Sequence, residues 1–331
     1  MYMFKYIMKR LLLLLLTFFI IITVCFVLIK LLPDTPVQGF GKDVELIYLR
    51  RVKLHQYYYD AVKGEYIRTP ILEQYFYFLL YAIQGDFGVS EVLFSGQDVW
   101  NVFVSKLPYT VALNLYSIVI SIPIGIGLGI LAAVKKNTWI DHLISTGVMV
   151  FVSVPSFIYG FLVQLLFCYK LHWFPGVMDA TNGPFSWTGF TSMFPAIMCL
   201  SFGTIAGFAR YTRAELTEVL TNEFMLLART KGLTRGQATF RHALRNSMVV
   251  IFPMILGEFI SIMSGSLILE QMFSIPGVGE LYVNSVTAQP NADYNVFMLL
   301  SGFYILIGLL AGIVIDISYG FIDPRIRMGA K

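Results

Sequence analysis

The sequence predicts an all-α, polytopic membrane protein with six transmembrane helices and both termini in the cytoplasm. Hydrophobic residues make up 57% of the 331 residues and charged residues only 13%, about half the charged share of a soluble domain. The mean hydropathy is +0.71. Six stretches are long enough to cross a bilayer core, which needs about 20 apolar residues. This composition excludes a disordered chain, a secreted disulfide-rich mini-protein and an ordinary cytosolic enzyme.

The apolar stretches divide into six spans and one shorter helix. The predicted spans are Leu11–Leu32, Tyr109–Val134, Leu143–Cys168, Phe194–Tyr211, Met248–Leu269 and Val296–Tyr319. The first has 19 apolar-run residues from Leu11 to Ile29 and no small-x-small cleavage site after it, so we expect an uncleaved anchor rather than a signal peptide. Another stretch, Ile71–Ile83, is too short to cross and contains Glu73 and Gln74. We expect it to be an amphipathic surface helix.

Lysine and arginine residues predict the orientation of the spans. With the N-terminus inside, the inner segments hold fifteen of these residues, whereas the two short outer loops hold only Lys170. Positive charge in short loops marks the cytoplasmic side, and long segments cross with little regard to charge. The chain then divides into the N-terminus and first span (1–32), an extracytoplasmic segment (33–108), a five-helix core (109–319) with a cytoplasmic loop (212–247), and a cytoplasmic C-terminus (320–331).

Residue types that carry catalysis or bind metals are scattered along the sequence. They are His55, His142, His172, His242, Cys25, Cys168 and Cys199. None of them pairs with another at ligand spacing, and no H-E-x-x-H, G-x-S-x-G or Walker loop is present. We therefore expect no catalytic residue, no metal site and no cofactor in this chain, so that energy for transport comes from another chain or an ion gradient. The net charge of +4 follows the membrane topology, and we expect no nucleic-acid partner.

Glu258 is the most informative residue inside a predicted span. It lies near the middle of the fifth span, five residues after Pro253. A carboxylate at this depth is costly unless it faces water or a partner. We expect Glu258 to face the translocation path or another subunit, and the alternative is a protonated carboxyl that serves packing. In the second span, Gly125 and Gly129 predict a close contact between helices, either a moving or a static one.

The cytoplasmic loop contains two helix-capping patterns around one glycine. Asn222 can cap a short helix with Glu223 in its first turn. Gly232 stands where a left-handed residue ends such a helix. Thr234 and Gln237 form a capping-box pattern that starts the next helix.

The first short helix of this loop has an apolar face. Phe224, Leu227 and Ala228 follow the i, i+3, i+4 spacing. On the cytoplasmic side this helix has no bilayer core to enter, which favours insertion into a groove on a partner. Two alternatives remain open: the helix lies on the membrane surface, or it packs on the chain's own spans.

The loop sequence EFMLLARTKGLT at 223–234 resembles the EAA loop of bacterial ABC importer permeases, especially the peptide and nickel branch. Three further segments resemble motifs of the same family in the same order: GDFGVS at 85–90, EQMFSIPGVG at 270–279 and DPRIR at 323–327. The set covers nearly the full length and is most similar to the B-type permease subunit of oligopeptide importers. The chain departs from the pattern at Leu226 and Leu227, which replace the usual polar pair.

The resemblance implies the type I permease fold of ABC importers and a multi-pass protein of the bacterial cytoplasmic membrane. The implied function is the permease subunit of an ATP-driven importer that forms the path for dipeptides or oligopeptides. The implied partners are a second homologous permease, two ATPase subunits that bind ATP and Mg, an extracytoplasmic peptide-binding protein and the lipid bilayer. The residues implied to contact the ATPase are Glu223, Phe224, Leu227, Ala228, Arg229, Lys231 and Gly232.

Three other functions compete with this interpretation. The same fold could import nickel or a metal chelate. A secondary transporter driven by an ion gradient would use Glu258 as its ion site, although no inverted repeat is visible. An intramembrane enzyme would need a catalytic dyad, and the sequence shows none.

Overall fold

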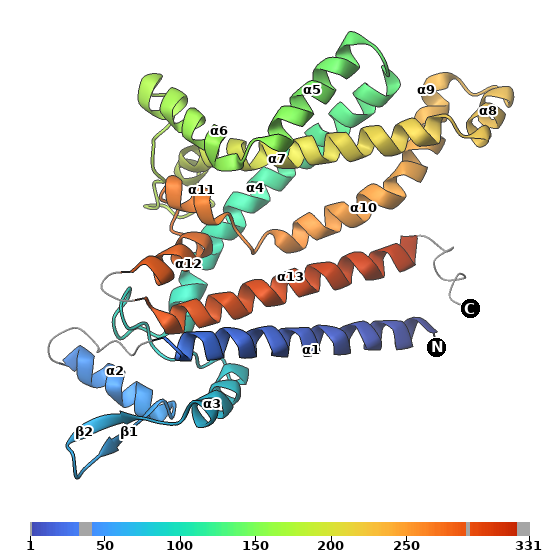
Figure 1. Cartoon of the computed structure of the whole chain (residues 1–331). Coiled ribbons are helices and arrows are strands. Elements are labelled where there is room, and N and C mark those ends of the chain that lie inside the picture. Colours follow the sequence, from blue (N-terminus) through green and yellow to red (C-terminus); the bar gives the residue numbers. More distant parts are fainter. Residues whose placement is uncertain (1, 33–41, 289–291, 323–331) are drawn as a thin grey trace.

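A computed structural model describes residues 2–32, 42–288 and 292–322 (Figure 1). The helices are α1 (Tyr2–Lys30), α2 (Lys42–Lys53), α3 (Ile71–Ile83), α4 (Val99–Val134), α5 (Trp139–Ser153), α6 (Ser156–Val163), α7 (Trp187–Leu220), α8 (Glu223–Thr230), α9 (Arg235–Ala238), α10 (Leu244–Ser261), α11 (Leu267–Met272), α12 (Val278–Thr287) and α13 (Tyr294–Ile322). Two π-helical segments, η1 (Gln164–Lys170) and η2 (Thr239–Ala243), follow α6 and precede α10. Strands β1 (Tyr57–Asp60) and β2 (Glu65–Arg68) pair antiparallel.

The long helices confirm the predicted class of protein. Five helical stretches in the described part of the chain are long and apolar enough to cross a membrane, and a bent pair provides a sixth candidate crossing. Several helices extend beyond the apolar stretches read from the sequence. In particular, α4 begins at Val99 and α7 continues to Leu220, because polar residues outside the bilayer continue these helices.

The third predicted span is not one straight helix. Its two halves, Trp139–Ser153 and Ser156–Lys170, are bent by 101° (Figure 1). Pro155 lies at the break, and Val154 before it has an extended backbone with ψ of 125°. A proline removes one backbone donor and pushes the preceding residue out of helical geometry, so the chain turns here.

The fifth span was predicted as Met248–Leu269, but its helix ends earlier than Leu269 in the structure. The continuous helical stretch runs from Arg235 to Ser261, and a turn then leads into the short helix α11. Gly265 in this turn has φ of +65°, a conformation that ends a helix without strain only at glycine. The Ser-Gly-Ser sequence at 264–266 was the signal of this turn.

Helices α4 and α7 form the most extensive contact between two spans. A Cβ atom added at Gly125 would lie 2.7 Å from Phe208 Cβ, and one added at Gly129 would lie 2.5 Å from Thr212 Cβ. The glycine pair therefore lets the two backbones approach closely, as the sequence predicted. One buried cluster joins α4, α6, α7 and α11 and includes the buried thiol of Cys199.

The outer segment forms a small unit at the far end of α1 and consists of α2, the β1–β2 hairpin and α3 (Figure 1). The hairpin was not expected from the sequence. Its tyrosine-rich strands are joined through Gly64, which has φ of +67°. Two ion-paired side chains, Arg51 and Glu91, lie 2.5 Å apart and tie α2 to the chain before α4.

A buried carboxylate attaches this unit to the last span. Asp293, fully buried just before α13, accepts a 2.5 Å hydrogen bond from the Ser90 hydroxyl. The same oxygen accepts bonds of 3.0–3.1 Å from the backbone N–H groups of Glu91, Val92 and Leu93. Ser90 is the last residue of the GDFGVS motif, so this motif serves as the joint between the outer segment and α13.

The N-terminal end of α1, the C-terminal end of α13 and helices α8 and α9 lie at the same end of the molecule (Figure 1). Arg10 of α1 and Asp316 of α13 form an ion pair of 2.8 Å near this end. Both termini of the described chain therefore share one side with the loop that carries α8. The cytoplasmic identity of this side remains the prediction made from the distribution of basic residues.

Candidate coupling site

Helix α8 begins and ends as the sequence predicts. Gly232 has φ of +92°. Its N–H donates to Arg229 O at 3.0 Å and the Leu233 N–H donates to Ala228 O at 3.3 Å, which is the paired bonding of a Schellman end. At the start, Asn222 occupies the N-cap position but its side chain makes no capping hydrogen bond, contrary to our expectation.

The next helix starts with the predicted capping box. The Thr234 hydroxyl accepts a bond from the Gln237 N–H at 3.3 Å, and the Gln237 side chain accepts one from the Thr234 N–H at 3.1 Å. Two capped helix ends thus flank residues 231–234. This arrangement fixes the turn from α8 into α9.

One face of α8 packs on the chain itself. Met225 and Ala228 are buried at 5% and 8% exposure in a cluster with Leu216 of α7 and Ala133 of α4. We expected Ala228 to share the partner-facing side with Phe224 and Leu227, and the structure corrects this. Ala228 supports α8 from beneath and is not available to a partner.

The adjoining face of α8 is open. Phe224 is 37% exposed and Leu227 is 56% exposed, although both are apolar. The charged residues Glu223, Arg229 and Lys231 are exposed beside them. The helix therefore combines a fixed inner face with an apolar outer face that carries charges at its edges.

A bidentate ion pair connects α7, which leads into α8, to the bent span. Arg213 Nε and Nη2 donate to the two oxygens of Asp141 at 2.5 and 2.9 Å. The Asp141 carboxylate also accepts from the Asn137 N–H and the Ser145 hydroxyl. Asp141 is 1% exposed at its side chain and Arg213 is 34% exposed. Sequence reasoning missed this pair, because the two residues are 72 positions apart and lie on different membrane spans.

Glu258 lies on α10, and its side chain is half-buried. Among the described residues we find neither a hydrogen-bond nor an ion-pair partner for its carboxylate. Its neighbour Gly257 faces Ile315 of α13, where an added Cβ would lie 2.9 Å from the isoleucine Cδ1. Glu258 therefore lies within a membrane-spanning helical stretch, Arg235–Ser261, whereas α8 precedes that stretch in the chain.

A second buried carboxylate, Glu270, explains the EQMFSIPGVG motif. Its Oε2 accepts bonds from the N–H groups of Gly279 and Glu280 at 2.7 and 3.1 Å, and thereby caps α12. Its Oε1 accepts from the Thr110 hydroxyl of α4 at 3.0 Å and the Ser266 N–H at 3.3 Å. Burial raises the pKa of Glu270 to about 7, although the hydrogen bonds from these four donors lower it.

The glycines of this motif make room for the carboxylate. A Cβ atom on Gly277 would clash with Glu270 Oε2 and with the Thr110 hydroxyl. A Cβ on Gly279 would lie 2.9 Å from the same carboxylate oxygen. The motif therefore describes a fixed outer turn between α11 and α12 that is attached to α4. The sequence showed the motif, but not the role of its glutamate.

The described part of the chain contains no group of three or more His, Cys, Asp or Glu side chains arranged to hold a metal ion. What the structure offers is a membrane bundle with a short helix mounted at one end. These features define a polytopic membrane protein that carries a short helix outside its membrane spans.

The comparisons with known proteins agree with this class. The chain belongs to the family of binding-protein-dependent transport system inner membrane components, which matches residues 125–328. It is a permease of an ABC-type importer and a protein of the inner membrane. The match starts within α4, so the outer segment precedes it.

Full-length relatives have names that specify their cargo. The chain is 32% identical over 326 residues to the dipeptide transport system permease protein DppB of Lactococcus lactis, covering 98% of this chain and 100% of that protein. It is 31% identical over 329 residues to the oligopeptide transport system permease protein OppB of Salmonella typhimurium, with the same coverage. The glutathione transport system permease protein GsiC of Escherichia coli is 32% identical over 328 residues, covering 98% of this chain and 99% of that protein.

A solved structure shows the same fold. A chain of the MetNI methionine ABC transporter, from inward-facing conformations, aligns with a TM-score of 0.51 at 17% identity. The alignment covers 66% of this chain and 96% of that chain. About a third of the present chain therefore lies outside the shared fold.

Proposed function

We propose that this permease forms one half of the path of an ATP-driven importer of dipeptides or oligopeptides. The names of three full-length relatives, which specify a dipeptide, oligopeptides and glutathione, support short peptides as the cargo. One structural observation carries the ATP-driven part of this proposal. Helix α8 has one face packed on its own chain and an apolar face open to the surroundings.

The open face of α8 is the proposed contact with an ATPase subunit. Phe224 and Leu227 enter a groove on that subunit, because an apolar helix face is recognised by burial in such a groove. Glu223, Arg229 and Lys231 surround the contact and orient it. Gly232 permits the turn behind the helix, and Ala228 contributes only from beneath.

Movement of α8 then reaches the spans through packed contacts. The cluster under α8 joins it to the ends of α4 and α7. From α7, the Asp141–Arg213 pair leads to α5, and α5 ends at the bend before Pro155. Two discrete arrangements of this bend would open the path alternately to each side. A second homologous permease, two ATPases and an extracytoplasmic binding protein complete the importer.

Glu258 is the proposed polar residue of the path. A half-buried carboxylate in a membrane-spanning helix is favoured only where water or a partner is near. In an assembled importer the path between two permeases supplies this water. The same residue would be the ion site in the competing ion-coupled transporter.

Aspartate substitutions on α8 test the coupling contact. We expect Phe224→Asp and Leu227→Asp to reduce co-purification of the ATPase subunits and uptake by about tenfold or more, equivalent to ~1.4 kcal/mol of lost contact energy. The control is Val62→Asp, because Val62 is 96% exposed in the hairpin at the other end of the molecule. Normal ATPase binding and uptake in both α8 variants would refute the contact.

Uptake assays test the cargo and the energy source separately. A strain without this permease should lose uptake of a labelled dipeptide or oligopeptide and keep nickel uptake, and a reintroduced copy should restore it. Loss of nickel uptake alone would favour the metal-importing alternative. Peptide uptake that stops on ATP depletion but survives an uncoupler supports the importer, whereas the reverse result would support ion coupling at Glu258.

A further inference from the structure

Helix α3 of the outer segment lies beside the last part of α1. The Tyr75 hydroxyl is 2.5 Å from the Thr23 hydroxyl, and the Tyr75 ring contacts the rings of Phe19 and Phe26. Thr23 precedes the outer end of the span at Lys30 by seven residues, which places it about 10 Å below that end at 1.5 Å per residue. Tyr75 therefore lies at the depth of the hydrocarbon and not above the bilayer.

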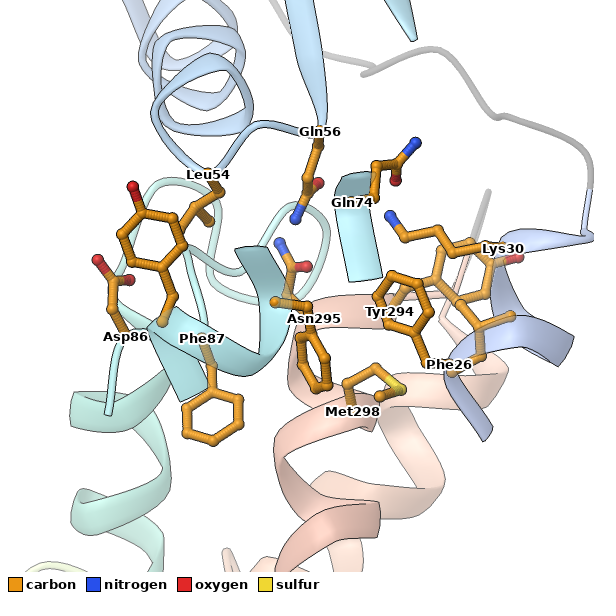
Figure 2. A pocket seen from close by; sticks show the side chains of 13 residues that line it. Phe26, Lys30, Leu54, Gln56, Gln74, Asp86, Phe87, Tyr294, Asn295 and Met298 are labelled. Atoms are coloured by element: carbon orange, nitrogen blue, oxygen red, sulfur yellow. The ribbon is translucent and has the colours of Figure 1, made fainter. Parts of the chain in front are cut away.

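The face of α3 that turns to the spans is closed by protein. Ile71, Tyr75 and Phe78 pack in one cluster with α1 and α13. Figure 2 shows the adjoining face, where Gln74 is one of the residues that line a cavity between α1, α3 and α13. The cavity has a volume of about 40 Å³. Gln74 is 1% exposed and its amide donates at 2.7 Å to Thr69 O just before α3, so this side of the helix is covered by protein.

The polar face of α3 is covered by the outer segment. The His55 ring stacks on Tyr77 with ring centroids 3.6 Å apart. The Tyr81 hydroxyl donates to Lys53 O at 3.1 Å. These contacts place the outer segment above α3, on the side away from the bilayer.

The remaining face of α3 is an apolar stripe that no part of the described chain covers. It consists of Leu72, Phe76, Leu80 and Ile83, which are 83%, 60%, 41% and 85% exposed. On a helix these positions fall within one sector, about a third of a turn from the face that packs on α1 and about a third of a turn from Tyr77 and Tyr81. With α1 crossing the bilayer, the stripe points toward the acyl chains while the polar face points to water.

We propose that α3 is an interfacial helix whose Leu72, Phe76, Leu80 and Ile83 stripe is seated in the acyl chains of the leaflet at the outer end of α1. The depth given by Thr23 agrees with the roughly 5–10 Å to which such helices enter the boundary between headgroups and chains. The helix thus holds the outer segment against the membrane surface. This role is independent of the cargo and of the ATPase contact, because it requires only that α1 crosses the membrane.

Spin labels on single cysteines test this placement in the full chain reconstituted in bilayers. The native Cys25, Cys168 and Cys199 are first replaced by alanine. Labels then go to Phe76, Leu72 and, at the helix end, Ile83. The lipid control is Leu15 on α1, with 64% exposure close to the 60% of Phe76, and the water control is Val62 with 96% exposure. Each label is measured with oxygen, which concentrates in lipid, and with a water-soluble nickel complex.

We expect labels at Phe76 and Leu72 to differ from the Val62 label in the direction of the deeper Leu15 label, with higher oxygen access and lower access to the nickel complex. Access to the nickel complex equal to that at Val62 would overturn the proposal, because the stripe would then face water. Protection from both reagents would also overturn it, because protein would then cover the stripe. If a label at Phe76 prevents insertion, the label at Ile83 answers the same question at the end of the helix.

Discussion

Gly232 shows how a single residue sets the direction of the proposed contact helix. Its φ of +92° lies in the region that only glycine enters without strain. No atom lies within 4 Å of a Cβ built there, so the requirement for glycine is one of backbone conformation and not of space. The sequence predicted this position correctly, because capping patterns are local and can be recognised without knowledge of the fold.

Substitution of Gly232 should separate transport from ATP hydrolysis. Gly232→Val should add about 1–2 kcal/mol of backbone strain and turn α8 away from its contact. We expect uptake per ATP hydrolysed to fall while membrane insertion is retained. Gly236→Ala is the matched control, because Gly236 also has open space around it but lies in helical conformation. Equal uptake in both variants would contradict the assigned role of Gly232.

Glu270 is the residue at which pH should affect stability. Burial raises its pKa from 4.5 to about 7, so the folded protein binds a proton more readily than the unfolded chain between these values. The contribution of Glu270 to the free energy of unfolding is therefore complete below about pH 4.5 and is lost as the pH rises through about 7. Glu270→Gln keeps an acceptor oxygen and does not titrate. Relative to the Tm of this variant, the Tm of the native protein should be lower at about pH 8 than at about pH 5. A Tm difference that stays constant over this range would refute the raised pKa of Glu270.

At the scale of elements, the bent span and α7 act as a connected pair. Arg213 and Asp141 form the only link of opposite charges that the described residues show between α7 and α5. The geometry is bidentate, which resists rotation of one helix against the other. In the proposed mechanism, this link carries a push on α8 to the bend at Pro155.

Breaking this pair should reduce stability and coupling together. We expect Arg213→Gln to lower the free energy of unfolding by about 1–3 kcal/mol, less than a fully buried pair because Arg213 is one-third exposed. Peptide uptake per ATP hydrolysed should also fall, and this ratio does not depend on the amount of folded protein. Arg210→Gln is the control, because Arg210 lies on the same helix, is exposed and hydrogen-bonds to the exposed hydroxyl of Tyr211. Unchanged coupling in Arg213→Gln would show that the pair serves stability alone.

The sequence predicted the existence of these elements better than their faces and ends. Hydropathy located all six candidate crossings, because twenty apolar residues in a row are a strong signal. It could not tell that α8 would bury Met225 with Ala228, because Phe224 and Met225 both stand at helical spacing from Ala228. Likewise, the bond from Ser90 to Asp293 and those to Glu270 join segments distant in sequence, and no local pattern reveals them.

At the scale of the whole molecule, the chain consists of a core shared with other importers and an added outer segment. The family match begins at residue 125, and the MetNI chain aligns with 66% of this chain. The core places α8 at the end that also holds the end of α13, whereas the outer segment lies at the opposite end (Figure 1). The two surfaces therefore lie at opposite ends of the spans.

The most direct test of the account is transport by reconstituted protein with and without the ATPase subunits. In the proposed mechanism, this permease is a gate that is moved by ATPase subunits on other chains. Vesicles containing this permease, its partner permease and both ATPases should accumulate labelled peptide from the binding protein only when ATP is supplied on the ATPase side. Peptide accumulation by the two permeases alone, without ATPases or ATP, would contradict it.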